Sequence, residues 1–208
     1  MSSPVRTEPP YVPIRRGRWP VGRTPRWLLL AVAALVVAAV LVGLAHRPSP
    51  AQRAADLRAF LADMRTDIQS CAGGVRDSLT AMRAIEAGTS HDVGTAIGIA
   101  TYGSQNCSPA NNMQLDDLVG YQVHESLSSF RLDRVVYGLV DWATPDALRV
   151  QADVAAVLRG PGAARAAATA KLQHDLRILD AQRAYLDKIM LAAIRATGAT
   201  GRPPPLPG

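Results

Sequence analysis

Four polar residues in the middle of the chain are spaced so that one helix could carry them on a single face. They are Asp117, Tyr121, His124 and Glu125. Residues three or four apart lie on the same side of a helix, and an imidazole beside carboxylates could bind a metal ion or act as a general acid or base. A solvated helix edge gives the same pattern, and short stripes of this kind often arise by chance.

The two cysteines of the chain are a second candidate for chemistry, because they could form a disulfide. Cys71 lies on the apolar face of an expected long helix, and Cys107 follows 36 residues later in a loop-like segment. In an oxidising compartment an even number of cysteines favours a disulfide, and closing a loop of this length stabilises a fold by about 3–4 kcal/mol. A free buried Cys71 and a redox-active pair are the alternatives. The sequence predicts a structural disulfide.

Motifs of other known chemistries are missing from the sequence. It contains no His-Glu-x-x-His, Cys-x-x-Cys or Glu-x-x-His metal motif, no Gly-x-Ser-x-Gly elbow and no phosphate-binding glycine loop. Only Glu86 and Glu125 follow residue 45, too few glutamates for a bundle that holds a pair of metal ions. His91 and His174 each precede an aspartate and are interpreted as surface residues. We therefore expect no cofactor, no metal and no enzyme activity.

An apolar segment near the N-terminus determines where we expect these residues to lie. Residues 27–45, WLLLAVAALVVAAVLVGLA, carry no charge, and as a helix they would span roughly 28 Å, enough for a bilayer core. Six arginines precede the segment, whereas only Arg47 and Arg53 follow it within ten residues. The positive-inside rule predicts a single-pass anchor, with residues 1–26 cytoplasmic and residues 46–208 outside. Cleavage near Ala45, which would release a secreted protein, is the alternative; the apolar run is longer than a usual signal-peptide core.

The positive charge of the chain belongs mainly to its N-terminal tail. The formal net charge is +6 and the pI is near 9.9, yet residues 46–208 hold 17 basic and 16 acidic side chains. This distribution argues against nucleic-acid binding. The tail itself is rich in proline and arginine, and we interpret residues 1–26 as disordered. A docking peptide around PPYVP is the alternative.

Apolar residues after the anchor recur at steps of three and four, the period of helices. One helix is expected from Ser49-Pro50 to about Glu86, with its apolar phase unbroken across Gly73-Gly74. A short helix capped by Ser90 and weakened by Gly94 and Gly98 should follow. A third helical region should run from Asn112 to about residue 140; a kink or division at SLSSF, residues 126–130, is the alternative. Another helix should run from Thr144-Pro145 to Gly160, and a last one from Ala163 to Gly198.

No segment has the alternating pattern of a strand, so the sequence predicts an all-α protein. Residues 46–197 should form one antiparallel bundle of about four or five helices, followed by a disordered, proline-rich tail over residues 198–208. The layout resembles that of small bitopic envelope proteins. Our leading hypothesis is a module that binds a protein partner or itself, in envelope scaffolding, assembly or regulation of a membrane partner. A sensor that binds a small ligand and works with a signalling partner is the alternative, and a cell-surface enzyme is less favoured.

Overall fold

The computed structural model describes residues 26–45 and 47–207, and in the first helix it describes the side chains of residues 27, 28 and 30–40 only. The chain divides into two units, residues 1–47 and residues 48–208, and each is described by itself. The basic tail over residues 1–25 and His46 lie outside the described residues. Every regular element of the described part is helical, which confirms the all-α prediction.

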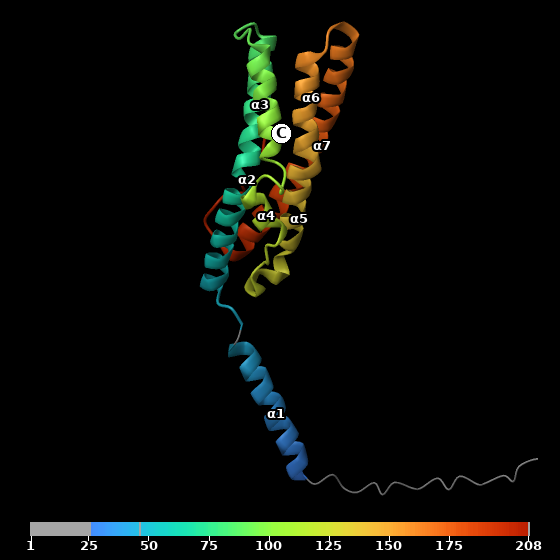
Figure 1. Cartoon of the computed structure of the whole chain (residues 1–208). Helices are drawn as coiled ribbons and strands as arrows, with labels where there is room; N and C mark the ends of the chain where they lie inside the picture. The colour runs from blue at the N-terminus through green and yellow to red at the C-terminus, as the bar shows by residue number, and fades with distance from the viewer. Residues whose placement is uncertain (1–25, 46, 208) are drawn as a thin grey trace, which may run out of the picture. The chain divides into compact units, whose positions relative to one another are not determined.

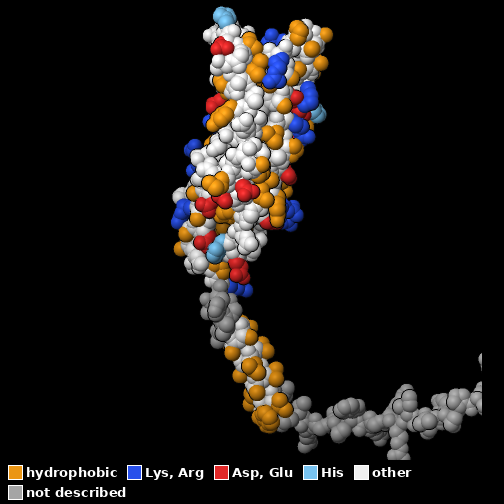
Figure 2. All heavy atoms as spheres, in the orientation of Figure 1, with side chains coloured by type: hydrophobic (Ala, Val, Ile, Leu, Met, Phe, Trp, Pro, Cys, Tyr) orange, Lys and Arg blue, Asp and Glu red, His pale blue; other side chains and the backbone are white. Residues whose placement is uncertain are grey.

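The first unit contains one helix, α1, from Arg26 to Ala45. Its large side chains face solvent, with Trp27 67%, Leu30 71% and Leu35 70% exposed, and Figure 2 shows hydrophobic side chains along its described part. Among the helices of the residues described, none is long and apolar enough to cross a membrane. The span over residues 27–45 stays a prediction from the sequence.

The second unit contains two helical hairpins, each made of one long and one shorter helix. A group of short elements lies at one end of the unit (Figure 1). Its elements are α2 (Pro50–Glu86), α3 (Val93–Gln105), α4 (Met113–Val119), the 3₁₀ helix η1 (Glu125–Phe130), α5 (Asp133–Asp141), the wide turn η2 (Trp142–Ala147), α6 (Leu148–Arg159) and α7 (Gly162–Thr197). They surround one continuous apolar core. The helical-bundle prediction is confirmed.

The two longest helices, α2 and α7, run in opposite directions. Arg165, in the first turn of α7, forms an ion pair of 3.8 Å with Glu86 at the end of α2. In the middle of α2, the Arg65 guanidinium donates a hydrogen bond of 3.1 Å to the carbonyl oxygen of Arg202, which follows the end of α7. Buried leucines and methionines of both helices fill the space between the elements.

Local sequence signals explain where α2 begins and why it continues. The Ser49 hydroxyl accepts a hydrogen bond of 3.1 Å from the backbone N–H of Gln52, and Pro50 occupies the first helical position, where its missing N–H has no cost. The helix continues through Gly73 and Gly74, as the unbroken apolar phase predicts. The cap of α3 differs from the prediction, since Asp92 rather than Ser90 accepts the N–H of Thr95, at 2.8 Å.

The third helical region is divided, which corrects the expected number of helices. Helix α4 ends at Val119, residues 120–124 are not helical, and η1 and α5 follow, so the second unit has six α-helices rather than four or five. Gly120 lies at the C-cap of α4, and the His124 ring caps η1. This change of direction lets Leu118 and Leu127 both enter the core, which supplies the physical reason for the break.

The C-terminal segment differs from the disordered tail that the sequence predicts. Gly198 ends α7 in the left-handed conformation, with φ of 68°, as expected for a C-terminal glycine. The chain then returns along the bundle in an extended form and buries Ala199 and Leu206. Burial of these apolar side chains and the hydrogen bond from Arg65 to Arg202 hold the segment in place.

Candidate functional site

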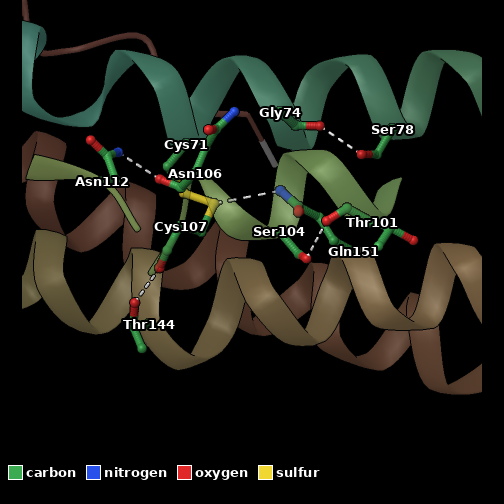
Figure 3. The surroundings of a disulfide bond; sticks show 10 residues. All are labelled: Cys71, Gly74, Ser78, Thr101, Ser104, Asn106, Cys107, Asn112, Thr144 and Gln151. Atoms are coloured by element: carbon green, nitrogen blue, oxygen red, sulfur yellow. Dashed lines mark hydrogen bonds between the residues drawn. A yellow bond between two sulfur atoms is a disulfide. The ribbon is translucent and has the colours of Figure 1, made fainter. Parts of the chain in front are cut away.

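A disulfide joins α2 to the end of α3, as the sequence predicts. Cys71 and Cys107 are bonded, their Cα atoms are 4.6 Å apart, and neither is exposed. Figure 3 shows how α6 and η2 meet the same point: the Gln151 side-chain amide donates to the Cys107 sulfur at 3.5 Å, and the Thr144 hydroxyl donates to the Cys107 carbonyl oxygen. The bond therefore pins the region where four elements meet.

Beside the disulfide, α2 and α3 touch backbone to backbone. A Cβ placed on Gly74 would lie only 2.8 Å from the Cα atom of Gly103, and one on Gly103 would lie 3.0 Å from the carbonyl oxygen of Gly74. The Ser78 hydroxyl donates a hydrogen bond of 2.6 Å to the same carbonyl oxygen (Figure 3). Two close neighbours fitted the sequence, residues 103–112 around Cys107 and the helix with Gly94 and Gly98; the structure places Gly103, of the first of these, against Gly74.

Two other glycines of this pair of helices, Gly73 and Gly98, have open space where a side chain would be. A Cβ on Gly73 or Gly98 would meet nothing within 4 Å. They line a groove between α2 and α3 with a volume of about 570 Å³. We call it the glycine groove and define it by Ser70, Gly73, Thr95, Gly98, Ile99 and Tyr102.

The chemistry of the glycine groove is that of a contact surface. Its floor has no side chain at two positions, so another backbone can approach closely. The Ser70 and Thr95 hydroxyls donate to Gln114 and Asp92, and their oxygens can still accept hydrogen bonds. Tyr102 is 68% exposed, and a tyrosine supplies a large apolar face with a polar end. The spacing of Gly94 and Gly98 signalled a close approach in the sequence, and only the fold showed that Gly98 faces solvent.

The predicted polar stripe does not exist, because the helix that would carry it ends too early. Asp117 belongs to α4, Tyr121 and His124 lie in the non-helical link, and Glu125 begins η1. The four side chains therefore do not share a helix face. Within residues 26–45 and 47–207, no cluster of histidine, cysteine and acidic side chains is arranged to hold a metal ion.

Tyr121 instead anchors the link to α2. Its hydroxyl donates a hydrogen bond of 2.9 Å to the Asp63 carboxylate, and its ring packs edge-on against Phe60 with centroids 5.8 Å apart. Burial, and next the bond to Asp63, raise the pKa of Tyr121. The tyrosine is a structural donor rather than an acid.

His124 and Ser126 contact Asp56 of α2, and the His124 side chain caps the N-terminus of η1. The Ser126 hydroxyl donates to the Asp56 carboxylate at 2.6 Å, and His124 Nδ1 lies 2.9 Å from the same hydroxyl oxygen. The Ser126 backbone N–H also donates to His124 Nδ1, at 3.3 Å. The Ser126 hydroxyl therefore bridges Asp56 and His124, and the group holds η1 against α2.

Asp117 contributes to an acidic cluster that the sequence analysis missed. Burial, followed by the charges of Asp63 and Asp117, raises the pKa of Asp67 to about 6. Asp63 and Asp67 are four residues apart on α2, a spacing that was visible in the sequence. Their proximity to Asp117 was not, because it depends on how α4 packs on α2.

No family model, no curated protein and no solved structure matches this chain. The candidate site is therefore argued from geometry alone.

Proposed function

We propose that the chain is a membrane-anchored helical module whose second unit lies outside the cytoplasm and binds a protein partner through the glycine groove. The role fits envelope scaffolding, assembly or regulation of a membrane partner. The observation that carries the proposal is the outward-facing pair Gly73 and Gly98, which leaves an open groove beside a rigid, disulfide-pinned contact.

The membrane anchor is supported by the sequence of residues 27–45 and by the charge on either side of it. The segment is uncharged and of sufficient length for a bilayer core. Arginines are concentrated before it, which favours a cytoplasmic N-terminus. A disulfide between Cys71 and Cys107 is the state expected of cysteines outside the reducing cytoplasm.

The partner is best described as a helix or an extended backbone. Small residues at a helix surface let another backbone pack at short distance, which increases dispersion contacts. The flanking Ile99 and Tyr102 supply apolar area, and aromatic side chains are enriched at interface centres. A sensor for a small ligand remains the alternative function; such ligands are usually held in a concave pocket with a few convergent polar groups.

Site-specific photo-crosslinking of the full chain in native membranes tests the proposal. A photoreactive phenylalanine analogue at Tyr102 should capture one partner. The matched control is the same analogue at Tyr137, since Tyr102 is 68% and Tyr137 is 67% exposed and only Tyr102 lines the groove. The Tyr102 adduct should disappear when Gly98→Leu fills the groove.

Ala170→Leu controls for the added bulk, because Ala170 is exposed on α7 and lies outside the groove. Circular dichroism should show that both leucine variants keep the wild-type helix content. Equal adducts at positions 102 and 137, or a Tyr102 adduct that survives Gly98→Leu, would contradict partner binding at this groove. A small molecule that co-purifies with the chain in place of an adduct would favour the sensor function.

A further inference from the structure

A second groove lies between the corner from η1 to α5 and the C-terminal third of α7. It has a volume of about 450 Å³. We call it the basic groove and define it by Phe130, Arg131, Arg134, Lys188, Ile189 and Ala192. Both sides of it supply a cationic and an apolar side chain, Arg131 and Phe130 from the corner and Lys188 and Ile189 from α7, so it combines two kinds of recognition.

The cations of the basic groove have no internal counter-charge. None of the ion pairs formed within residues 26–45 and 47–207 includes Arg131, Arg134 or Lys188. The residues that line the groove include no carboxylate among the part of the chain described. Three positive groups around one hollow repel each other unless an anion lies between them.

The backbone at Arg131 is in an uncommon conformation. Its φ of 56° and ψ of 34° place it in the left-handed region, and it is the only non-glycine residue with positive φ in the described chain. Such conformations cost free energy and are enriched at functional positions. Here the turn follows η1 directly and leads into α5, so that Arg131 and Arg134 both line the groove.

The basic groove lies at the end of the unit where α2 begins. Ser126 of η1 bonds to Asp56, in the second turn of α2, at 2.6 Å, and Figure 1 shows the η1–α5 corner at the same end of the unit as the start of α2. Only residues 46–49 separate α1 from α2, a link that reaches at most about 17 Å when extended. The anchor proposed above would therefore tether this end of the unit to the membrane surface.

We propose that the basic groove binds one anionic phospholipid. Arg131, Arg134 and Lys188 would contact the headgroup phosphate, because guanidinium and ammonium groups form charge-assisted hydrogen bonds with phosphate oxygens. Phe130, Ile189 and Ala192 would contact the first part of an acyl chain. The source of the lipid rests on the proposed membrane anchor, whereas the binding chemistry is independent of any partner in the glycine groove.

Native mass spectrometry of the full chain, purified in a neutral detergent, tests this inference. After incubation with phosphatidylglycerol the chain should retain one lipid, and it should retain phosphatidylcholine at least about tenfold less. The triple variant R131Q/R134Q/K188Q should lower phosphatidylglycerol retention roughly tenfold or more. Ala192→Glu, which places a carboxylate in the groove, should have the same effect.

Two matched controls separate a site from general electrostatics. The triple variant R76Q/R83Q/R159Q removes the same charge from exposed arginines outside the groove, and Ala170→Glu adds a carboxylate elsewhere on α7. Both should retain the lipid as the wild type does.

Equal losses of lipid in the control and groove variants, or equal retention of the two lipids, would overturn the proposal. Binding of inorganic phosphate alone, without lipid retention, would overturn the lipid assignment. If the otherwise wild-type chain forms no adduct at position 102 but retains the lipid, the result would count against the glycine groove and leave this inference standing.

Discussion

Gly74 of α2 and Gly103 of α3 lie in direct backbone contact, since a Cβ on Gly74 would be 2.8 Å from the Gly103 Cα atom. The disulfide between Cys71 and Cys107 lies one turn away on the same two segments. The glycine contact lets the two helices lie close together, and the disulfide holds them there. The adjacent Gly73 has open space where its side chain would be. Gly73 and Gly74 are therefore a matched pair for substitution, one without a neighbour and one in close contact.

Substitution of Gly73 and of Gly74 by alanine should change stability in opposite directions. Gly74→Ala should lower the free energy of unfolding by about 1–3 kcal/mol, because two backbones must separate to admit a methyl group. Gly73→Ala should raise it by up to about 1 kcal/mol, because alanine favours the helix and meets no neighbour. Urea unfolding followed by circular dichroism measures both. A destabilised Gly73→Ala variant would contradict the open position of this residue.

Reduction of the disulfide should lower the stability of the folded chain. Cys71 and Cys107 are separated by 36 residues, and loss of this cross-link should cost about 4 kcal/mol because the unfolded chain gains conformational freedom. The double variant C71S/C107S should show the same loss, with a lower Tm that no longer responds to reductant. The native chain should contain no thiol that reacts with Ellman's reagent; two reactive thiols before reduction would refute the prediction.

Removal of the Asp67 carboxylate should stabilise the protein at neutral pH. The pKa of Asp67 is about 6 in the folded state and 3.8 without the effects of the fold. The folded state therefore binds the proton more tightly, and stability falls as pH rises from about 4 to about 6. Asp67→Asn should remove this penalty, on the order of 1 kcal/mol after solvent screening.

Urea unfolding of wild type and Asp67→Asn at pH 4 and pH 7.5 tests this dependence. The variant should be more stable than the wild type at pH 7.5, and the difference should shrink at pH 4, where the wild-type carboxyl is protonated in the folded state. Asp63→Asn is a useful comparison, because it removes a charge that raises the Asp67 pKa and keeps an amide oxygen that can accept from the Tyr121 hydroxyl. A difference that does not change with pH would exclude titration of Asp67 as the cause.

Loss of the Lys171 charge should destabilise the contact between α6 and α7. The Lys171 ammonium donates to Asp153 at 2.7 Å and to Asp175 at 2.8 Å, and both carboxylates are largely buried. Lys171→Met leaves two neighbouring carboxylates without their donor, and we expect a loss of about 2 kcal/mol at pH 7. Burial raises the pKa of Asp153, so the loss should decrease as pH falls.

Lys188→Met is the matched control for that experiment, because Lys171 and Lys188 are the only lysines. Lys188 forms no ion pair among residues 26–45 and 47–207, so its loss should change the free energy of unfolding by less than about 0.5 kcal/mol. Equal effects of the two lysine substitutions on urea unfolding would contradict a stabilising role for the Lys171 bridge.

The elements with strong local signals could be predicted from the sequence. The start of α2 is set by Ser49 and Pro50, and the end of α7 by Gly198. These signals act within one or two helical turns, so they do not depend on the rest of the chain. The SLSSF segment offered a division of residues 112–140 as an alternative, but no local signal placed the break at residues 120–124. The apolar spacing of the region fits one helix, and the break follows from the Tyr121 contact with Asp63 and the burial of Leu127.

The sequence by itself determined the helical class and favoured the pairing of the only two cysteines, because periodicity and residue count are enough for these; the anchor stays a prediction from residues 27–45. Only the tertiary structure decided that Gly74 meets Gly103 while Gly73 and Gly98 face outward. The same is true of the hydrogen bond between Arg65 and the C-terminal segment, and of the groove that Arg131, Arg134 and Lys188 line together. These relationships join residues far apart in the chain, and their geometry is set by how whole helices pack.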